Sequence, residues 1–599
     1  MPVLPSTSDG MSLAPVIKSN GSVLPEAWLG ALLELRVRRA VRTIGRCTLR
    51  FADPGYTLAS ASKLKVGATI QVSAKADGEG TTLTTVFEGK VTSTGVESSD
   101  ADQPELIVVA EDLAYELSRT ARAATYLKQK ASEIITKVVA DSGAASTIDA
   151  TDHVLDYTLQ TGTDLAFIDE LCRRNGLDWE VNETTFRAWT SHNGTKLSDP
   201  AAQPVVTLTL GNDMRTFSAR VYGDAPKSVT VRGWDHLNKE EIVATSELGR
   251  SKLPNGMSAL LSEGSIRRAT TLDAQAGPVD RADAKTLADV LSAETGTVVA
   301  RGVGPMLPMV RPGVTVTVAD AGPASGDYYV REVEHTFRPS GFHTAFVAGD
   351  RGQTSLVPPN DASVSSSFQH AGLVVGMVSA IKDDPEAAGR IKVSLPGLDT
   401  KIESQWARLA VLGGGAGRGM VFLPEVGDEV LVGFEGGDVR RPVVLGGLFG
   451  KKDKIPTDLV GSSEVEHRRL TSRLGHVVEL SDGTDASTQH IRLALAGETI
   501  SLRLGKDRAD LKLPSGVPLK IVSGSSSIEM DGSGAIKLSG TTIALKAEQG
   551  VTIEGMDVTA KATAKLAASG AQVEVKGSAT TTIESSGVTA VKGAMVQIN

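Results

Sequence analysis

Residues 521–540 read IVSGSSSIEMDGSGAIKLSG and contain a repeat eight residues long. An apolar residue, any residue and a glycine recur in that order at 522–524, 530–532 and 538–540, and again at 553–555, 575–577 and 591–593 after small slips in phase. A short strand ending in glycine is typical of a β-helix, because each rung must turn where only glycine tolerates the backbone. The predicted corners are Gly524, Gly532, Gly540, Gly555, Gly577 and Gly593.

Eight residues are too few for one chain to close a rung of such a helix. Three chains winding together close it, and each then buries its alternate valines and isoleucines against the other two. We therefore predict an intertwined trimer with Ile553, Val575 and Val591 in its core. The alternatives are a β-solenoid made by one chain and a β-sandwich with accidental glycines. The sandwich is disfavoured because the region has hardly any aromatic side chains to build its core.

Upstream of the repeat, residues 372–450 form a strand-rich region of a size typical of a small barrel. A charged neck follows it, and a Pro/Ser-rich linker, DRGQTSLVPPNDASVSSSFQH (350–370), precedes it. Before the linker, alternation of apolar and polar residues from about 32 to 110 and from 205 to 347 predicts antiparallel strands. The fold class is therefore mainly β.

Three helices interrupt this pattern. In 131–143 the apolar residues share one helical face, and Gly143 follows as a C-terminal signal. In the second helix Thr163 is the predicted N-cap and Gly176 ends the helix. Alanines and leucines at helical spacing predict a third helix over 280–294.

Composition excludes several classes of protein. The chain has 62 basic and 71 acidic residues, so it has no excess of positive charge with which to neutralise the phosphate backbone of a nucleic acid. Its two cysteines, Cys47 and Cys172, can form neither a disulfide framework nor a four-ligand zinc site, and no cofactor is expected. Neither a signal peptide nor an apolar stretch long enough to span a membrane is evident, so we expect synthesis and assembly in a bacterial cytoplasm.

The barrel region carries the most specific motifs: GMVSAIKDDPEAAGRIKVSLP (376–396), QWAR (405–408) and LPEVGDEVLVGFEGGDVRRPVVLGGLF (423–449). They are similar to the opening, Trp-containing and closing strands of the barrel in VgrG-type spike proteins of contractile injection systems. Weaker matches are QTGTDLAFIDELCRRNGL (160–177), VTVRGWD (229–235), GDYYVREVEHTF (326–337), RLTSRLGHVVELSDG (469–483) and VKGAMVQIN (591–599). The order of parts also resembles this family, in which phage-type hub and spike proteins are fused into one chain.

The resemblance implies a homotrimer whose hub halves form a ring of six similar barrels under a sixfold inner tube. It also implies an oligonucleotide/oligosaccharide-binding (OB)-type collar and a C-terminal prism that pierces the target envelope. The expected parts are a flexible arm (1–20), hub β domain 1 (21–115), an inserted α/β segment (116–200), hub β domain 2 (201–350), a linker (351–371), the OB-type barrel (372–450), a neck (451–470) and a triple-stranded β-helix spike (471–599).

The partners implied are the inner-tube and baseplate proteins, effector cargo, transiently a target membrane, and a PAAR-repeat cap protein at the tip. Three copies of the chain's end would present an open β face there, and such a face is a docking surface. The predicted cap-docking residues are Met595, Val596, Gln597, Ile598 and Asn599. The alternative is that the last residues fray and bind nothing.

Groups that suggest chemistry have simpler structural interpretations. GGGAGRG (413–419) precedes a strand rather than a helix, which predicts a flexible barrel loop instead of a phosphate site. His335 and His343 could face one another across a hairpin, as a polar pair rather than a metal site. Two acidic groups are both expected to form a solvated rim rather than a calcium or catalytic site. The first lies in a Pro-containing turn and the second at a turn and strand start: Asp383, Asp384 and Glu386, and Glu425, Asp428 and Glu429.

The neck over 450–469 is too short for an enzyme domain, and the chain stops soon after its last repeat, so a non-enzymatic protein is expected. Two rival hypotheses are a trimeric carbohydrate-binding or adhesive tail fibre and a cell-wall hydrolase with an unrecognised site. Among contractile systems we favour a phage-tail-like particle over a cell-anchored secretion system.

Overall fold

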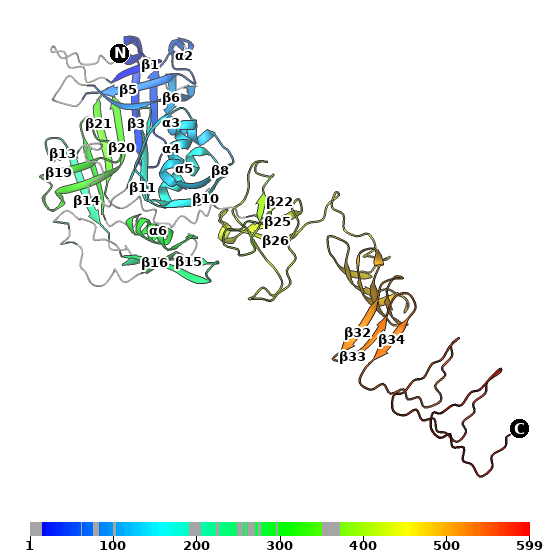
Figure 1. Cartoon of the computed structure of the whole chain (residues 1–599). Helices are drawn as coiled ribbons and strands as arrows, with labels where there is room; N and C mark the ends of the chain where they lie inside the picture. Colours follow the sequence, from blue (N-terminus) through cyan, green and yellow to red (C-terminus); the bar gives the residue numbers. More distant parts are fainter. Residues whose placement is uncertain are drawn as a thin grey trace, which may run out of the picture. The chain divides into compact units, whose positions relative to one another are not determined.

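The structure is a computed structural model of the 599-residue chain. It describes residues 15–61, 63–75, 83–99, 103–190, 205–222, 227–247, 256–257, 260, 270–273, 277–294, 298–349 and 372–598. The chain divides into two compact units, Met1–Asp453 and Lys454–Asn599 (Figure 1). The predicted linker 351–371 and Asn599 lie outside the described residues, as does the arm up to residue 14.

A sheet of thirteen strands, here called the large sheet, organises the first unit. Its strands are β1 (Val16–Ser19), β2 (Ser22–Val23), β3 (Leu32–Ala40), β4 (Arg46–Ala52), β5 (Thr69–Ala74), β6 (Thr84–Glu97), β7 (Glu105–Glu111), β13 (Val205–Thr209), β14 (Thr216–Val221), β18 (Val298–Gly304), β19 (Thr315–Ala319), β20 (Gly326–Arg338) and β21 (Gly341–Ala348). Their order is β14-β18-β21-β20-β3-β4-β7-β6-β5-β1-β2, with β19 beside β20 and β13 beside β19. Two short helices, α1 (Glu26–Gly30) and α2 (Thr57–Ala61), lie in the first half.

The antiparallel pairing of β3 with β20 joins two segments about three hundred residues apart in the chain (Figure 1). Alternation along these strands gives the sheet a buried face and a polar face, as the period of two requires. Leu35, Val37 and Val333 are fully buried, whereas Arg36 and Arg38 between them are exposed. The predicted flexible arm is wrong for its last residues, because Ile17 on β1 is buried and β1 pairs with β5.

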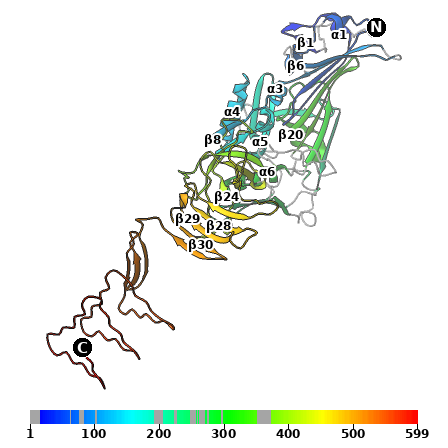
Figure 2. The same ribbon diagram turned by 90° about the vertical axis from the view of Figure 1, so that its right-hand side faces the viewer.

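Between β7 and β13 the chain forms an inserted α/β segment. Its elements are α3 (Leu113–Arg119), β8 (Ala124–Lys130), α4 (Ala131–Asp141), β9 (Ala145–Ile148), β10 (Val154–Gln160), α5 (Asp164–Arg174), β11 (Leu177–Asn182) and β12 (Thr185–Thr190). Figures 1 and 2 both show α3, α4 and α5 gathered together. The predicted caps are confirmed: Thr163 Oγ1 accepts a hydrogen bond from the backbone N–H of Ala166, and Gly143 and Gly176 follow their helices with positive φ.

A second excursion, between β14 and β18, contains β15 (Ser228–Asp235), β16 (Glu240–Glu247), β17 (Thr270–Asp273) and α6 (Arg281–Glu294). Helix α6 confirms the helix predicted over 280–294. Its alanines and leucines pack on β15 and β16 through Val231 and Ile242. This small α/β layer is thus held by its own apolar cluster.

The barrel region forms a five-stranded sheet in the order β23-β22-β25-β26-β24. The strands are β22 (Val374–Ala380), β23 (Lys392–Ser394), β24 (Arg408–Leu409), β25 (Glu429–Phe434) and β26 (Pro442–Gly447). Val378, Val393, Val430 and Val432 point into a core that is continuous with that of the inserted segment. The OB-type barrel expected for 372–450 is present in the structure as this half-barrel sheet.

The second unit begins with a five-stranded antiparallel meander, here called the meander sheet, formed by β27 (His467–Thr471), β28 (Val477–Asp482), β29 (Gln489–Ala494), β30 (Ser501–Gly505) and β31 (Ala509–Lys512). A three-stranded sheet follows, with β32 (Leu519–Ser523), β33 (Ser526–Met530) and β34 (Ile536–Ser539). Residues 541–598, all of them described, contain no helix or strand.

This arrangement differs from the triple-stranded β-helix expected for 471–599. The strands up to Ser539 pair within one chain through tight turns, so their hydrogen bonds need no second copy. Beyond Ser539 the single chain shows no β-helix. The triple-stranded β-helix expected for 471–599 therefore stays a prediction for residues 541–598.

Candidate interaction surfaces

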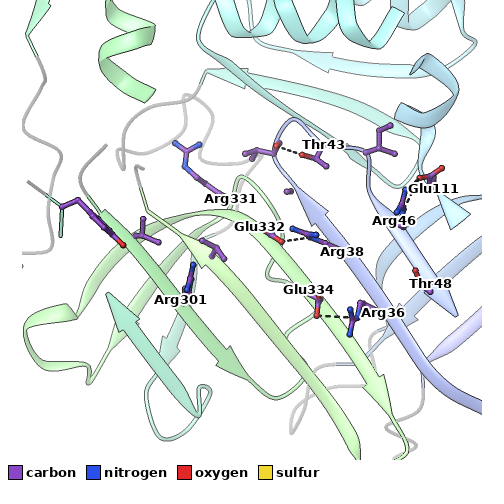
Figure 3. Close-up of a pocket in the computed structure, with 16 residues that line it drawn as sticks. Arg36, Arg38, Thr43, Arg46, Thr48, Glu111, Arg301, Arg331, Glu332 and Glu334 are labelled. Atoms are coloured by element: carbon purple, nitrogen blue, oxygen red, sulfur yellow. Dashed lines mark hydrogen bonds and ion pairs between the residues drawn. The ribbon is translucent and has the colours of Figure 1, made fainter. Parts of the chain in front are cut away.

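A hollow of about 1060 Å³ lies on the polar face of the large sheet (Figure 3). Strand register places Glu334, Arg38, Arg46 and Glu111 in one row across β20, β3, β4 and β7. Arg38 Nε lies 2.7 Å from Glu332 Oε1, and Arg46 Nη2 lies 2.7 Å from Glu111 Oε1. Exposed pairs of this kind each contribute at most about 1 kcal/mol. This surface is therefore a solvent-exposed face of the sheet that carries paired charges.

The lining of this hollow holds five arginines and three glutamates, an excess of two positive charges. Figure 3 shows Arg301 standing apart from the three ion pairs on the neighbouring strands. The described lining residues include no histidine or cysteine, and six of their eight charged side chains form ion pairs with one another.

A second hollow, of about 720 Å³, lies between the inserted segment, the second excursion and the barrel. Tyr157 Oη donates to the backbone oxygen of Glu403 at 2.9 Å, and Arg441 Nη2 donates to the backbone oxygen of Trp234 at 2.5 Å. Burial and then the charges of Arg408 and Arg441 lower the pKa of His236. This imidazole therefore binds a proton less readily than an ordinary histidine side chain.

Beside this hollow, a buried charge network ties the barrel to the helices. Arg440, only 7% exposed, follows the turn after β25 and reaches Asp438 Oδ2 at 2.7 Å and the backbone oxygen of Gly277 at 3.1 Å. Its Nη1 lies 3.9 Å from Asp283 on α6, and Asp283 also receives Arg174 of α5 at 3.2 Å. Burial alone would raise the pKa of Asp438, but Arg440 holds it below its usual value. The network therefore fixes the barrel against the inserted segment.

The two histidines expected to face one another lie on opposite faces of the sheet, so that expectation is wrong. Register pairs His335 with Thr344, and His343 with Thr336, so a one-residue offset separates them. His335 Nδ1 lies 2.9 Å from Thr344 Oγ1 inside the core. The polar partner of the buried histidine is a threonine.

Asp384 organises the Pro-containing turn predicted at 383–389. Its carboxylate accepts bonds from the backbone N–H groups of Glu386, Ala388 and Arg390 and from the Arg390 guanidinium. Burial opposes ionisation of Asp384, but these bonds lower its pKa to about 2. In the other acidic group, Asp428 accepts the N–H of Glu425 at the exposed turn before β25, and Glu429 begins that strand. Both turns are structural.

The glycine-rich stretch 413–419 is a surface loop, as predicted. Gly415 pairs with Arg418 in a single antiparallel bridge, and Gly413, Gly417 and Gly419 have positive φ. The residues that follow, 420–428, contain neither helix nor strand before β25 begins. A helix N-terminus that could hold a phosphate is therefore not present in this described segment.

The meander sheet of the second unit has one apolar and one charged face. The apolar face is at least partly exposed along all five strands, and it consists of Leu470, Val478, Leu480, Ile491, Leu493, Leu502, Leu504 and Leu511. Register places these side chains opposite one another, as in Val478 with Leu493 and Leu480 with Ile491. A single chain thus exposes one whole face of apolar side chains.

The charged face of the meander sheet centres on Glu479, which is almost fully buried. Its carboxylate accepts bonds from Arg469 Nε at 2.6 Å, Arg492 Nε at 3.1 Å and His490 Nε2 at 3.2 Å. Burial acts to raise the pKa of Glu479, but the Arg469 bond and the other cations lower it. This network holds β27, β28 and β29 in register and directs their apolar side chains to the other face.

The three-stranded sheet repeats this division at smaller scale. Ile521 pairs with Ile528, and Met530 with Ile536, on one exposed apolar face. Lys520, Glu529 and Lys537 line the other face. The alternation of apolar and polar residues along these strands thus again places the apolar side chains on one face, which the single chain leaves exposed.

The predicted trimer-core residues are strongly exposed in the single chain, at 69% for Ile553, 74% for Val575 and 72% for Val591. Of the predicted corners, Gly524 and Gly532 have positive φ, whereas Gly540, Gly555, Gly577 and Gly593 do not. A Cβ at Gly532 would lie 2.7 Å from the backbone nitrogen of Val517, so this corner also needs glycine for space. Met595, Val596, Gln597 and Ile598 of the predicted docking face are all exposed.

Among the described residues no group of histidine, cysteine and acidic side chains could hold a metal ion. In the same residues, no helix is long and apolar enough to cross a membrane. The meander sheet was not anticipated as a separate element, although the alternation in HVVELSD, QHIRLALA and SLRLG signals its strands.

Two family models match the chain. The type VI secretion system/phage-baseplate injector OB domain matches residues 374–449, and the Alg8 N-terminal domain matches residues 11–338. The type VI secretion system spike protein VgrG5 of Pseudomonas aeruginosa is 40% identical over 75 residues, which are 12% of this chain and 10% of the relative. The chain therefore aligns with about a tenth of that relative's length.

Similar solved structures extend the match over most of the chain. The half-lidded Francisella PdpA–VgrG complex aligns with 83% of this chain and 87% of that chain, at 10% identity and a TM-score of 0.50. The lidless PdpA–VgrG complex aligns with 83% and 97%, at 10% identity and a TM-score of 0.50. At this identity the likeness shows a shared fold.

The barrel region therefore matches the injector OB domain of type VI secretion systems and phage baseplates, and the chain shares its fold with the chains aligned in the two PdpA–VgrG complexes. The chain belongs to the family of the Alg8 N-terminal domain, whose model covers more than half of it.

Proposed function

We propose that three copies of this chain assemble into the spike of a phage-tail-like contractile particle. The first unit docks on the inner tube and baseplate, and the C-terminal prism pierces the target envelope so that cargo follows. The observation that carries this proposal is the uncovered apolar face of the meander sheet. A second and third copy of the same chain would cover it with matching surfaces.

The energetics favour such association. Eight apolar side chains per chain stand partly exposed on the meander sheet. Burying the remaining half of a leucine is worth on the order of 1 kcal/mol, so this face alone offers about 8 kcal/mol per chain. Ile553, Val575 and Val591 are also exposed, so burial of their side chains against other copies would favour association in the repeat region as well. We infer that residues beyond Ser539 form the triple-stranded β-helix only within the trimer.

The role is mechanical rather than catalytic. The two hollows described above are lined by ion pairs and structural hydrogen bonds, and the buried Arg440 network couples the barrel rigidly to the inserted segment. Rigid coupling supports transmission of a compressive load, and an intertwined prism has no free sheet edges at which to unfold.

Partners are expected at both ends. The similar solved structures are complexes of a VgrG protein with PdpA, which supports engagement of a further protein by this chain as well. At the other end, the exposed face formed by Met595, Val596 and Ile598 is proposed to bind a PAAR-repeat cap.

The test is the mass of the purified full-length chain by sedimentation, followed by binding to assembled inner tube. We expect a trimer at every concentration at which the chain is folded, and a complex with the tube. A folded monomer would contradict the trimer. A trimer that binds glycans but not the tube would favour an adhesive fibre instead.

A further inference from the structure

The barrel displays an apolar surface that its own chain leaves uncovered. In the stretch 411–426, here called the barrel loop, every large apolar side chain is exposed: Val411, Leu412, Met420, Val421, Phe422, Leu423 and Val426. Leu412 is 74% exposed and Phe422 59%. Single exposed apolar residues are ordinary, but a cluster of seven on one loop marks a binding surface.

The barrel loop has local structure of its own. The backbone N–H of Gly415 donates to Arg418 at 3.1 Å, and that of Met420 donates to Leu412 at 3.0 Å. These bonds close a small hairpin that brings Leu412 and Met420 side by side. The loop is anchored at one end by β24 and at the other by β25. Leu412 and Met420 are thus presented from a formed turn, and the other apolar side chains of the loop follow it in sequence.

We infer that the barrel loop is a self-association surface, covered by the same loop of the other copies in the trimer. The inference rests on the proposed trimer and adds a contact made by the first unit. Residues 448–466 tether each barrel to a meander sheet. Once the second units associate, so short a tether keeps the three loops at an effective concentration in the millimolar range.

The charge of the barrel loop favours a second copy of the chain, rather than a lipid surface, as the partner that covers the loop. Within 411–426 the charged side chains are Arg418 and Glu425, so the loop is neutral overall. Three neutral loops meet without repulsion, whereas loops that bind anionic membranes carry an excess of lysine and arginine beside their apolar residues. The two native cysteines do not complicate a test, because both are fully buried and burial raises the pKa of each thiol.

The experiment places a cysteine at Phe422 in the full-length chain (Phe422→Cys) and treats the protein with a short bis-maleimide. Thr400→Cys, at an exposed position of the same barrel outside the loop, is the matched control. We expect at least tenfold more cross-linked dimer from Phe422→Cys than from Thr400→Cys. Sedimentation of each variant is measured in parallel.

The outcomes separate the two proposals. A trimer in which both cysteines cross-link equally, or in which neither does, overturns the self-association of the loop and leaves the trimer standing. A monomer overturns the proposed function together with this inference.

A second variant, Leu412→Ser with Phe422→Ser, tests the lipid alternative. It is compared with the unmodified trimer for binding to vesicles of phosphatidylcholine and phosphatidylglycerol. We expect neither protein to bind, and both to be trimeric because the meander sheets are unchanged. A loss of tenfold or more in vesicle binding upon substitution would assign the loop to a membrane instead.

Discussion

His335 is a buried imidazole on β20 whose environment disfavours a proton. Burial, and then the charge of Arg39, lowers its pKa to about 3. In the unfolded chain a histidine binds a proton near pH 6.5, so below that pH the unfolded state binds more protons than the folded state. The contribution of the neutral, buried His335 to the free energy of unfolding is therefore fully present above pH 6.5, and it decreases as the pH falls toward 3. At pH 5 the loss is about 2 kcal/mol.

The measurement is urea unfolding of the first unit in the full-length protein at pH 7 and at pH 5. His335→Gln should reduce the difference between the two pH values by about 2 kcal/mol, because the titrating group is removed. His343→Gln, on the opposite face of the same hairpin, should leave the difference unchanged. Equal effects of the two substitutions would show that burial of His335 is not the source.

Arg440 is the residue on which the junction between barrel and helices depends most. Arg440→Met leaves Asp438 buried without its bidentate partner, and removal of one member of a buried pair costs roughly 3 kcal/mol or more. We expect the urea midpoint of the first unit to fall accordingly. Arg508→Met removes an exposed partner of Asp510 and should cost less than about 1 kcal/mol. Similar costs for both variants would contradict a structural role for the network.

At the scale of elements, the proposed trimer depends on the apolar face of the meander sheet. Leu493 lies on β29 between Val478 and Leu502, at the middle of that face. Leu493→Asp would place three carboxylates in the proposed trimer interface, each costing several kcal/mol without a partner. We expect monomers by sedimentation, with β-sheet circular dichroism retained.

The matched control for this substitution is Lys506→Asp, in the exposed turn between β30 and β31, which should remain trimeric. In the repeat region, Val575→Asp should likewise prevent assembly of the trimer, whereas the same substitution at the neighbouring Lys576 should have little effect. Trimers of unchanged stability for Leu493→Asp would show that this face is not the interface.

The elements predicted from sequence are those whose signals are local. Thr163 and Gly176 mark the ends of α5 because capping depends on neighbouring backbone groups. Register is not local: His335 and His343 flank the predicted turn, yet a one-residue offset separates their faces. The strands from His467 to Lys512 show the same alternation as the repeat, but alternation does not encode whether the partner strand belongs to the same chain. Their pairing therefore could not be predicted from period alone.

For the whole molecule, in-chain pairing decreases along the second unit. The meander sheet pairs five strands, the next sheet pairs three, and residues 541–598 pair none among those described. In the proposed trimer, the parts that pair within one chain can form before association, and the last part forms only upon association. Trimerisation should therefore begin at the meander sheet and proceed toward the tip, since association there brings the three tails together.

The tip supplies a prediction for the assembled particle. Deletion of Val596 to Asn599 removes the exposed apolar end but none of the strands of the second unit, so the trimer should keep its mass and thermal stability. Its affinity for a PAAR-repeat protein from the same system should fall at least a hundredfold, because an open β end binds through backbone groups and apolar side chains that the deletion removes. Copurification and calorimetry measure the binding, and Lys592→Ala, an exposed change just before the last glycine corner, serves as the control. Undiminished binding by the truncated trimer would place the cap elsewhere and would favour a frayed end at these four residues.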